Sequence, residues 1–526
     1  MSTVAATTVA AWLRDGTEIA FLDVREHGQY GESHPLRVVW LPYSMLEARI
    51  VHFVPRRATR TVLLDAGDGV ATRAAARLAA MGYTAVHVMA GGNAAWGGAG
   101  LEVYKGVNVP SKAFGEAVEH GFDTPRIEPE ELAAMRARGE NMVIVDGRTP
   151  AEFTRMSIPG GISIPNGELI YRIKDIAPDP ATTVVVNCAG RTRSIIGAQT
   201  LRNAGIPNRV VALEGGTMAW RLAGFELEHG RAGTLPAVSA AGLEQAGAAA
   251  QAMRARYALP LLDARALRTL RDDPARTTYL LDVRPGAEFA AGHLPGARHA
   301  PGGQLVQATD EWCAVWGARI VLVDEGSGVR ATTTAHWLKQ MGWDVYVLAG
   351  AAALATETGS TRPTAPANPD LSALAPAAAR ALVDAGRALF VDVDESVHYR
   401  ARRLPGAIWG CRPRIDRIAA RLPAGVTAIL YSEHETRARL AAIDLAEVSG
   451  NPVAILAGGR EAWCAAGGAV EAAPGEPPNA ERIDFLFWVH DRHLGNDQAA
   501  RDYLAWEEAL PAQLARSGER FALAKP

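Results

Sequence analysis

VIVDGRTPAEF, at residues 143–153, is an apolar run that ends in Asp146 and continues into a turn. The same pattern occurs three more times, as AFLDVREHGQY (20–30), LLDVRPGAEF (280–289) and LFVDVDESVHY (389–399). Self-similarity of this kind indicates an architecture built from repeats. The first marker of each repeat is the aspartate that ends the run: Asp23, Asp146, Asp282 or Asp392.

A second apolar run follows each marker, as TVLLDAGDG, TVVVNCAGR, IVLVDEGSG and AILYSEHET. The residue that ends this run is Asp65, Cys188, Asp324 or Ser432, which lies 42 residues after the aspartate in the first three repeats and 40 in the fourth. A third stretch, such as ALEGGTMAW, closes each repeat 30 to 32 residues later, at Trp96, Trp220, Leu354 or Trp463. The three markers recur four times at nearly constant spacing, which establishes four repeats.

Each repeat has the pattern of an α/β domain. The apolar runs are short, rich in Val, Ile and Leu, and do not alternate with polar residues, which is typical of strands covered on both faces. Amphipathic stretches such as ATRAAARLAAMGY (71–83) and SIIGAQTLRNAG (194–205) lie between them and predict helices. We therefore expect each repeat to be a parallel sheet with helices on both faces.

The expected domains lie at 1–108, 118–230, 254–358 and 370–472, with a helical, aromatic C-terminal extension at 480–526. Expected linkers, rich in Pro, Gly and Ala, cover 108–117, 229–242 and 357–370. The extension is too apolar to be a free tail, because it contains Phe485, Phe487, Trp488, Tyr503 and Trp506. We expect it to pack on the body of the protein or on a second subunit, so a homodimer is possible.

Composition limits the possible functions. The chain has 526 residues, 48% hydrophobic and 21% charged, with a net charge of −3, which argues against a nucleic-acid partner. The N-terminus lacks a basic signal-peptide region, and no stretch has the length and apolarity of a membrane span. The four cysteines are widely spaced without a CxxC pair, which favours free thiols, a reducing compartment and a cytoplasmic location.

Cys188 is the candidate nucleophile. The predicted strand TVVVN delivers it to the carboxyl end of a parallel sheet, where ligands bind in this class of fold. A loop follows, containing Ala189, Gly190, Arg191, Thr192 and Arg193, and a helix is expected to begin near Ser194. The helix N-terminus, the loop amides and the two arginines all favour a thiolate or persulfide anion at this place. Cys188 is therefore the predicted catalytic residue, and the loop through Ser194 is the predicted substrate-binding segment, together with Arg148.

These motifs resemble the rhodanese (thiosulfate sulfurtransferase) family, and in particular bacterial single-chain sulfurtransferases with four rhodanese repeats. The matching pieces are Val145–Arg148, Ile158–Gly161, the loop 188–193, and Glu214–Gly216 with Trp220. The resemblance implies four tandem rhodanese-like domains and a cysteine that takes the outer sulfur of thiosulfate, releases sulfite and passes the sulfur to cyanide or a thiol. It implies no metal and no cofactor.

The loop departs from the family in one respect. The family loop usually reads Cys-x-x-Gly-x-Arg, whereas here Gly190 comes one place early and Arg191 stands at the usual glycine position. Related phosphatases use Cys-x5-Arg, and the spacing from Cys188 to Arg193 is Cys-x4-Arg, which argues against phosphatase activity.

The other three loops have no thiol, because Asp65, Asp324 and Ser432 stand at the position of the cysteine. Two of these loops, DAGDGV and DEGSGV, are acidic and would repel an anionic donor. We therefore expect repeats 1, 3 and 4 to be inactive, with a structural role or a role in shaping the pocket of repeat 2.

Several residues have a structural interpretation beside a functional one. Cys313, Cys411 and Cys464 are expected to be buried small side chains, and Trp220 a core residue. The first-marker aspartates occur in all four repeats and so favour a structural role, while for Arg148 and Glu214 the two interpretations are equal. His490 and His493, three residues apart, could bind a metal, but a packed or solvated pair is favoured because no further ligands accompany them.

Two functions remain. The first is an enzyme that moves sulfane sulfur from thiosulfate, or a related donor, to a thiol or cyanide through a Cys188 persulfide. The second is a non-catalytic persulfide carrier or an interaction scaffold. The cysteine-free repeats and the aromatic extension suggest this alternative.

Overall fold

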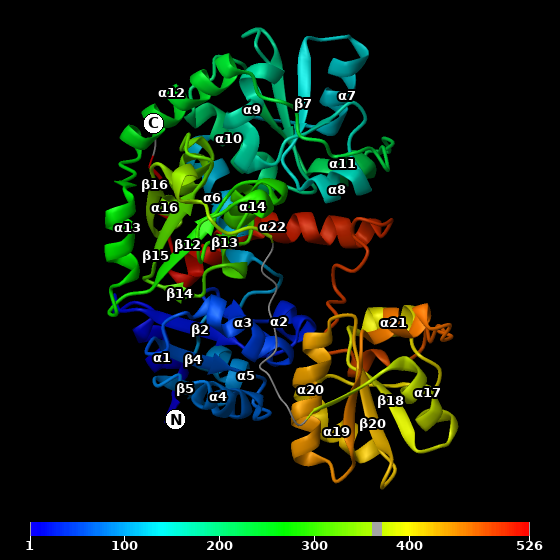
Figure 1. Cartoon of the computed structure of the whole chain (residues 1–526). Helices are drawn as coiled ribbons and strands as arrows, with labels where there is room; N and C mark the ends of the chain where they lie inside the picture. The colour runs from blue at the N-terminus through cyan, green and yellow to red at the C-terminus, as the bar shows by residue number, and fades with distance from the viewer. Residues whose placement is uncertain (1, 360–370, 525–526) are drawn as a thin grey trace. The chain divides into compact units, whose positions relative to one another are not determined.

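The strands of repeat 2 form one parallel sheet in the order β6-β10-β9-β7-β8 in the computed structural model, which describes residues 2–359 and 371–524 (Figure 1). The strands are β6 (Arg126–Ile127), β7 (Met142–Asp146), β8 (Ile162–Ser163), β9 (Thr183–Asn187) and β10 (Val210–Leu213). The helices are α6 (Val109–Phe122), α7 (Pro129–Ala137), α8 (Pro150–Arg155), α9 (Leu169–Ile176), α10 (Thr192–Asn203) and α11 (Gly216–Leu222).

Both faces of this sheet are buried. In β9, Val184 and Val186 belong to one hydrophobic cluster, with Leu169 and Leu201 from the helices α9 and α10. Val185 points the other way, into a second cluster that includes Trp220. Successive strand residues alternate between faces, so two clusters mean a sheet covered on both sides. This confirms the α/β fold and the core position of Trp220.

The other repeats have the same strand order. Repeat 1 contains β1 (Ser2–Val4), β2 (Ile19–Asp23), β3 (Val39–Trp40), β4 (Arg60–Leu64) and β5 (Val86–Met89). Repeat 3 contains β11 (Leu261–Leu262), β12 (Thr278–Asp282), β13 (Arg298–His299), β15 (Arg319–Val323) and β16 (Asp344–Leu348). Repeat 4 contains β17 (Ser372–Leu374), β18 (Ala388–Asp392), β19 (Ile408–Trp409), β20 (Thr427–Tyr431) and β21 (Val453–Leu456). The orders are β1-β5-β4-β2-β3, β11-β16-β15-β12-β13 and β17-β21-β20-β18-β19, so the four predicted repeats are confirmed.

Helices alternate with these strands along the chain. Repeat 1 has α1 (Ala6–Trp12), α2 (His27–Glu32), α3 (Leu46–Phe53), α4 (Val70–Ala80) and α5 (Gly92–Gly98). Repeat 3 has α13 (Ala264–Arg271), α14 (Gly286–Ala291), α15 (Gly302–Gln307) and α16 (Val329–Gln340). Repeat 4 has α17 (Pro376–Asp384), α18 (Ser396–Ala401), α19 (Ile415–Arg421), α20 (Glu435–Val448) and α21 (Gly459–Ala465).

The second and third markers meet at the carboxyl end of the sheet. In repeat 2 the amide of Thr217 donates to the carbonyl oxygen of Cys188 at 2.8 Å. Gly216 has a φ of +55°, and a Cβ at this position would overlap that same carbonyl oxygen. The glycine pair is therefore needed for the close approach of the α11 turn to the Cys188 loop.

The chain divides into two units, one formed by repeats 1 and 4 with the start of the C-terminal extension, up to Phe487, and the other by repeats 2 and 3 with the rest of the extension. Within the first unit, Arg412 pairs with Glu47 at 2.6 Å and with Asp444 at 2.8 Å. Within the second unit, Arg330 of repeat 3 pairs with Glu168 of repeat 2 at 2.7 Å. In each unit a buried arginine thus joins two repeats.

Two of the expected linkers contain helix. The segment 108–117 forms most of α6, which begins with Pro110 in its first turn, a position where proline suits a helix. The segment 229–242 is extended until α12 (Ala240–Arg256) begins. The third linker, at 357–370, lies largely outside the described residues. In the C-terminal extension, the predicted helix is confirmed as α22 (Asp497–Ser517), which packs against α6.

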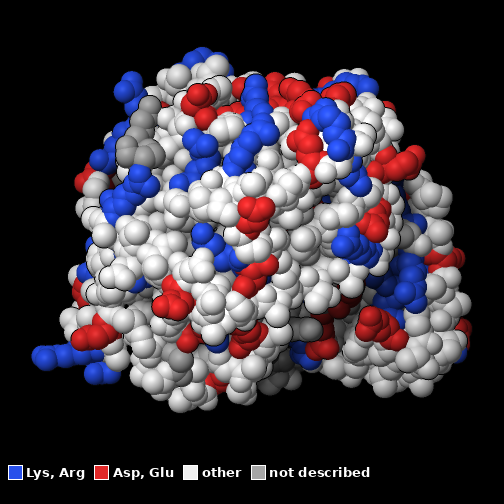
Figure 2. All heavy atoms as spheres, turned by 90° about the horizontal axis from the view of Figure 1, so that it is seen from above, with Lys and Arg blue, Asp and Glu red and all other residues white. Residues whose placement is uncertain are grey.

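In the described part of the chain, no helix combines the length and apolarity needed to cross a bilayer. Basic and acidic side chains are interspersed on the face that Figure 2 shows.

Candidate functional site

Cys188 directly follows β9, and α10 begins four residues later, at Thr192 rather than near Ser194 as expected. Its side chain is buried, with 2% of the residue exposed. The hydroxyl of Ser194 lies 3.0 Å from Cys188 Sγ and donates to it. The thiol therefore lies at a helix N-terminus and has a hydrogen-bond donor ready to stabilise a negative charge on sulfur.

Asn166 ties this loop to the first marker. Its side-chain amide donates to the carbonyl oxygen of Arg193 at 2.9 Å, and its backbone amide donates to that of Gly147 at 3.1 Å. A Cβ at Gly147 would overlap Asn166 Oδ1, which explains why glycine stands there. Asn166 thus fixes the start of α10 relative to β7.

Arg193 is a basic residue of the loop that interacts electrostatically with Cys188. Its guanidinium pairs with Glu152 at 2.7 Å and donates to Gln304 of repeat 3 at 3.2 Å. Burial opposes ionisation of Glu152, but Arg193 and Thr149 outweigh it and lower the pKa of this carboxyl to about 2. Arg193 is therefore held in one orientation by a fixed carboxylate and by a side chain of the neighbouring repeat.

Arg191 occupies a different environment. Its guanidinium binds both carboxylate oxygens of Glu116, at 2.9 and 3.0 Å, and that of Glu119 at 2.5 Å. Its other two partners are Glu214, in the third stretch of the repeat, and the exposed Glu508. The guanidinium is thus already surrounded by protein carboxylates, and substrate binding by Arg191 stays a prediction.

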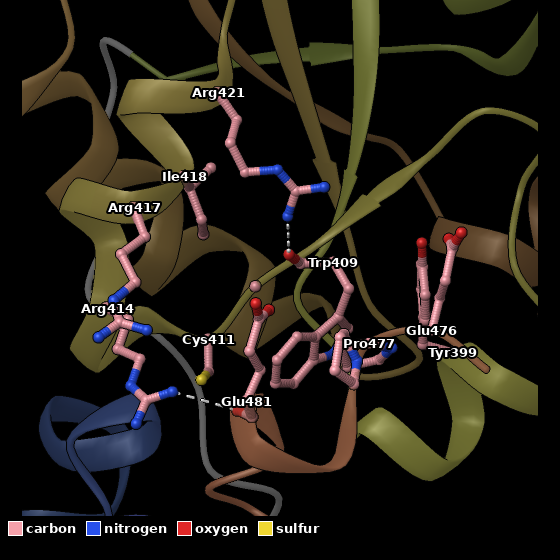
Figure 3. Close-up of a pocket in the computed structure, with 12 residues that line it drawn as sticks. Tyr399, Trp409, Cys411, Arg414, Arg417, Ile418, Arg421, Glu476, Pro477 and Glu481 are labelled. Carbon is pink, nitrogen blue, oxygen red and sulfur yellow. Dashed lines mark hydrogen bonds between the residues drawn. The ribbon is translucent and has the colours of Figure 1, made fainter.

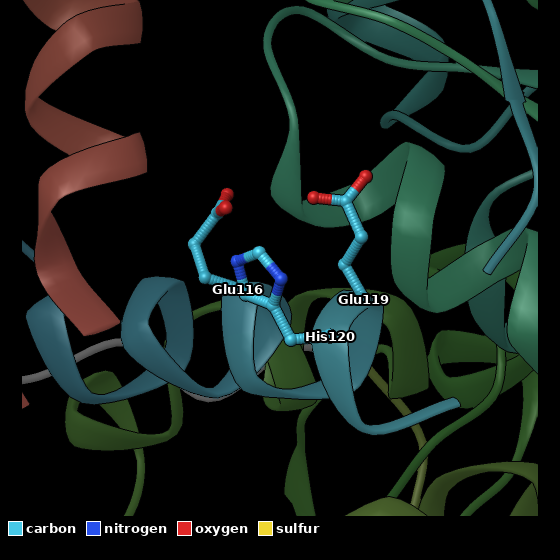
Figure 4. Close-up of side chains that lie close together, drawn as sticks. All are labelled: Glu116, Glu119 and His120. Atoms are coloured by element: carbon cyan, nitrogen blue, oxygen red, sulfur yellow. The ribbon is translucent and has the colours of Figure 1, made fainter. Parts of the chain in front are cut away.

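Glu116 and Glu119 lie on α6 together with His120, close enough to hold a cation (Figure 4). The Arg191 guanidinium already contacts both carboxylates and supplies the positive charge that such a group requires. Burial raises the pKa of Glu116 to about 7, although Arg191 opposes this shift. The cluster therefore has an internal counter-ion.

Arg148 is bound within its own turn. It pairs with Asp146 at 2.7 Å and donates to the carbonyl oxygen of Met156 at 2.6 Å. Arg25 and Arg284 make the same two contacts in repeats 1 and 3. In repeat 4, where Asp394 replaces this arginine, Arg460 pairs with Asp394 and reaches the equivalent carbonyl of Arg402. Recurrence in repeats without a thiol supports a structural role, and a substrate contact of Arg148 stays a prediction.

The C-terminal helix α22 covers the Cys188 loop. Glu507 Oε2 accepts from the backbone amide of Arg191 at 3.4 Å, and Oε1 accepts from Thr192 Oγ1 and from the Tyr503 hydroxyl, both at 3.1 Å. A Cβ at Gly190 would lie 3.0 Å from Glu507 Oε2 and 2.9 Å from Met218 Cε. The early glycine thus leaves room for side chains of α22 and α11, while Arg191 pairs with the acidic cluster on α6.

The remaining thiols differ from Cys188. All four cysteines are free; Cys313 and Cys411 are buried as predicted, and Cys464 is half-buried. Burial raises the pKa of Cys313 to about 12 and that of Cys411 well above its usual value. Both thiols are therefore poor nucleophiles at neutral pH.

Cys411 lines a cavity of about 410 Å³ in repeat 4 (Figure 3). Arg414, Arg417 and Arg421 of the α19 segment also line it, and Arg421 donates to the carbonyl oxygen of Trp409 at 3.0 Å. The cavity lies beside β19, whereas the position equivalent to Cys188 is Ser432 after β20. It is thus separate from the crevice where the chemistry of this fold is expected.

His490 and His493 are not brought together with further ligands among the described residues. His490 pairs with Asp491 at 2.9 Å, and His493 is half-buried. Burial, assisted by Arg492, lowers the pKa of His493 to about 3, so this imidazole is neutral at physiological pH.

The model of the rhodanese-like domain matches residues 5–99, 128–223, 263–353 and 375–466. The chain belongs to the rhodanese-like family. The solved structure of a thiosulfate sulfurtransferase from Pseudomonas aeruginosa is 42% identical, with a TM-score of 0.92 over 98% of each chain. A sulfurtransferase from Allochromatium vinosum is 33% identical over 101 residues, which are 19% of this chain and 92% of that protein. An uncharacterized protein from Synechocystis is 33% identical over 99 residues, 19% of this chain and 53% of that protein.

Sequence reasoning missed the residues that α6 and the extension bring to the loop from outside the rhodanese-like domains. Lys112 and Glu116 lie in a segment interpreted as a linker, and Glu507 lies more than 300 residues from Cys188. The aromatic character of the extension indicated that it packs on something, but no local pattern named the loop as its partner.

Proposed function

We propose that this protein is a sulfurtransferase that uses Cys188 to carry a sulfane sulfur from thiosulfate, or a related anionic donor, to a thiol or to cyanide. The observation that carries the proposal is the thiol after β9, at the N-terminus of α10, within 3.0 Å of the Ser194 hydroxyl. The sulfurtransferases among its relatives support the same class of reaction.

The first transfer forms a persulfide. The thiolate sulfur of Cys188 attacks the outer sulfur of thiosulfate, an Sγ–S bond forms, the S–S bond of the donor breaks, and sulfite leaves with the electron pair. Ser194 and the positive end of α10 stabilise the anionic terminal sulfur. The charge of Arg193 interacts electrostatically with Cys188 and favours an anionic donor.

The second transfer restores the enzyme. A thiolate or cyanide acceptor attacks the terminal sulfur of the persulfide, takes this sulfur and releases the Cys188 thiolate. Electrons balance over the two transfers without an added oxidant or reductant. Because Cys188 is 2% exposed, reactants must be small or must reach it by movement of the covering segments.

Intact-protein mass spectrometry after exposure to thiosulfate tests the first transfer. We expect a gain of one sulfur atom in the wild-type protein and none in Cys188→Ala, with turnover of thiosulfate to sulfite lost in the same variant. Cys464→Ser is the matched control, because it removes the most exposed of the four thiols and should leave both readouts unchanged. An adduct on Cys188→Ala would contradict the proposal.

The same experiment separates an enzyme from a carrier. Many turnovers with small acceptors indicate an enzyme. A persulfide that forms once and leaves only on addition of a protein partner indicates the carrier alternative. A cytoplasmic location and a homodimer also stay predictions.

A further inference from the structure

Lys112 is a buried cation on α6 at the edge of the Cys188 loop. Only 4% of the residue is exposed. Its ammonium makes no hydrogen bond and no ion pair with the residues that the structure describes, and the rings of Tyr503 and Trp506 face it at 5.8 and 6.0 Å. A buried charge without a partner is costly, so its retention calls for an explanation.

The position of α6 places this side chain next to the loop. One turn after Lys112, Gly115 packs directly on Thr192, where an added Cβ would lie 2.7 Å from Thr192 Cγ2. Tyr503, whose ring faces the ammonium, also contacts the Gly190 position, at 3.4 Å from an added Cβ. Lys112, Tyr503 and the loop therefore border the same space.

The carboxyl groups around Lys112 form no ion pair with it. Glu507 has the strongest electrostatic effect on Lys112, but its oxygens already accept from Arg191, Thr192 and Tyr503. Burial raises the pKa of Asp310 to about 7, although Lys112 opposes this shift, so this carboxyl is only partly ionised at neutral pH.

The other charges facing Lys112 are cations. Arg193 and Arg492 both act on it electrostatically, and burial lowers the pKa of Lys112 itself. Arg193 is paired with Glu152, and Arg492 stacks over the ring of Tyr503 at 4.6 Å. An anion entering this space would supply the missing counter-charge and favour the protonated ammonium.

We infer that Lys112 binds the anionic end of the sulfur donor, a sulfonate-type oxoanion such as the SO₃ group of thiosulfate, on its way to Cys188. This inference rests on the proposed function for the identity of the donor, but the anion site itself can be tested without turnover. Lys112 is thus a specificity-determining residue supplied by the helix that precedes repeat 2, outside the Cys-x4-Arg loop.

The test uses sulfate, which cannot donate sulfur, as the probe. Alkylation of Cys188 by iodoacetamide, an uncharged reagent, is followed by peptide mass spectrometry in the full-length protein. We expect sulfate to slow alkylation of the wild-type protein, and Lys112→Met to need about tenfold to a hundredfold more sulfate for the same protection, since one charge-assisted contact is lost. Lys112→Arg should keep the protection. Lys174→Met, which removes a lysine on α9 of repeat 2, is the matched control.

Thiosulfate then gives the second readout. Lys112→Met should raise the thiosulfate concentration for half-maximal persulfide formation by a similar factor and change the saturating rate little, which a merely structural role would not do. Equal sulfate protection in wild type and Lys112→Met would overturn the inference, as would an unchanged thiosulfate dependence. If sulfate protects through Lys112 but no adduct forms, the proposed function fails while the anion site stands.

Discussion

The loop after β9 in repeat 2 and the loop after β15 in repeat 3 differ in what fills them. In repeat 3, Asp324 Oδ1 accepts from the amides of Gly326 and Gly328 at 2.9 and 3.1 Å, and Oδ2 accepts from Ala331 at 3.1 Å. In repeat 2, no backbone amide of the described residues donates to Cys188 Sγ, and its hydrogen bond comes from Ser194. The loop of repeat 3 carries its own carboxyl group in the amide cradle, whereas in repeat 2 the residue at this position bonds to none of the described loop amides, and the amide of Arg191 donates instead to Glu507 of α22.

The loops of repeats 1 and 4 are filled by their own side chains in the same way as the loop of repeat 3. Asp65 accepts from the amides of Gly67 and Ala71 at 2.8 and 2.9 Å. Ser432 Oγ accepts from the amide of His434 at 3.2 Å. The cysteine-free repeats are therefore not merely without a thiol. Their loops are closed by a side chain that accepts hydrogen bonds from the loop amides.

Cys188→Asp should give the largest effect, because it introduces the side chain of repeats 1 and 3 into repeat 2. We expect complete loss of the persulfide and a fall in thiosulfate turnover of about 10⁴-fold or more, as for removal of other nucleophiles. The fold should persist, since two other repeats accept aspartate at this position. Turnover and circular dichroism check the two expectations, and an unfolded variant would show that α22 or α11 cannot tolerate the carboxyl group.

Arg191→Gly should give the next largest effect, on stability. This change restores the usual family loop but leaves Glu116, Glu119 and Glu214 without their common partner. Breaking a buried ion cluster by removing one partner costs about 3–5 kcal/mol of the free energy of unfolding. Urea unfolding measures this cost, with Arg202→Gly, at the other end of α10, as a control for replacing an arginine by glycine. A midpoint equal to that of the wild type would show that the cluster does not need its cation.

Asp324→Ala should have a smaller effect, confined to repeat 3. The amides of Gly326, Gly328 and Ala331 lose their acceptor, and an unsatisfied buried amide costs about 1–3 kcal/mol. We expect faster hydrogen exchange at the start of α16 and unchanged persulfide formation at Cys188. A fall in persulfide formation would instead show that this loop supports repeat 2 directly.

Local patterns were enough to predict the repeats and the position of Cys188. These patterns are the apolar runs, the aspartate that ends the first run and the glycine pair in the third stretch of a repeat. They indicate strands and turns whose geometry depends on residues close in sequence. α6 was missed because the Asn-Val-Pro-Ser start was interpreted as a linker, although proline in a first turn also begins helices.

The environment of Arg191 could not be predicted, for a different reason. Its partners Glu116, Glu214 and Glu508 lie 75, 23 and 317 residues away. Nothing in the loop itself distinguishes a guanidinium open to a substrate from one enclosed by carboxylates. Long-range ion pairing depends on the packing of α6 and α22, which no periodicity specifies.

Glu116→Gln should have the smallest effect, visible only as a change with pH. Burial raises the pKa of Glu116 from its usual 4.5 to about 7 in the folded state. A raised folded-state pKa means that the folded protein binds this proton more tightly, so the contribution to stability is fully present below about pH 4.5 and is lost as pH rises through about 7. Between about pH 6 and pH 8 the wild-type protein should therefore lose about 1 kcal/mol relative to Glu116→Gln. Hydrogen exchange of α6 at both pH values measures the difference, with the exposed Glu131→Gln as control. A difference that does not change with pH would show that Arg191 keeps Glu116 ionised throughout.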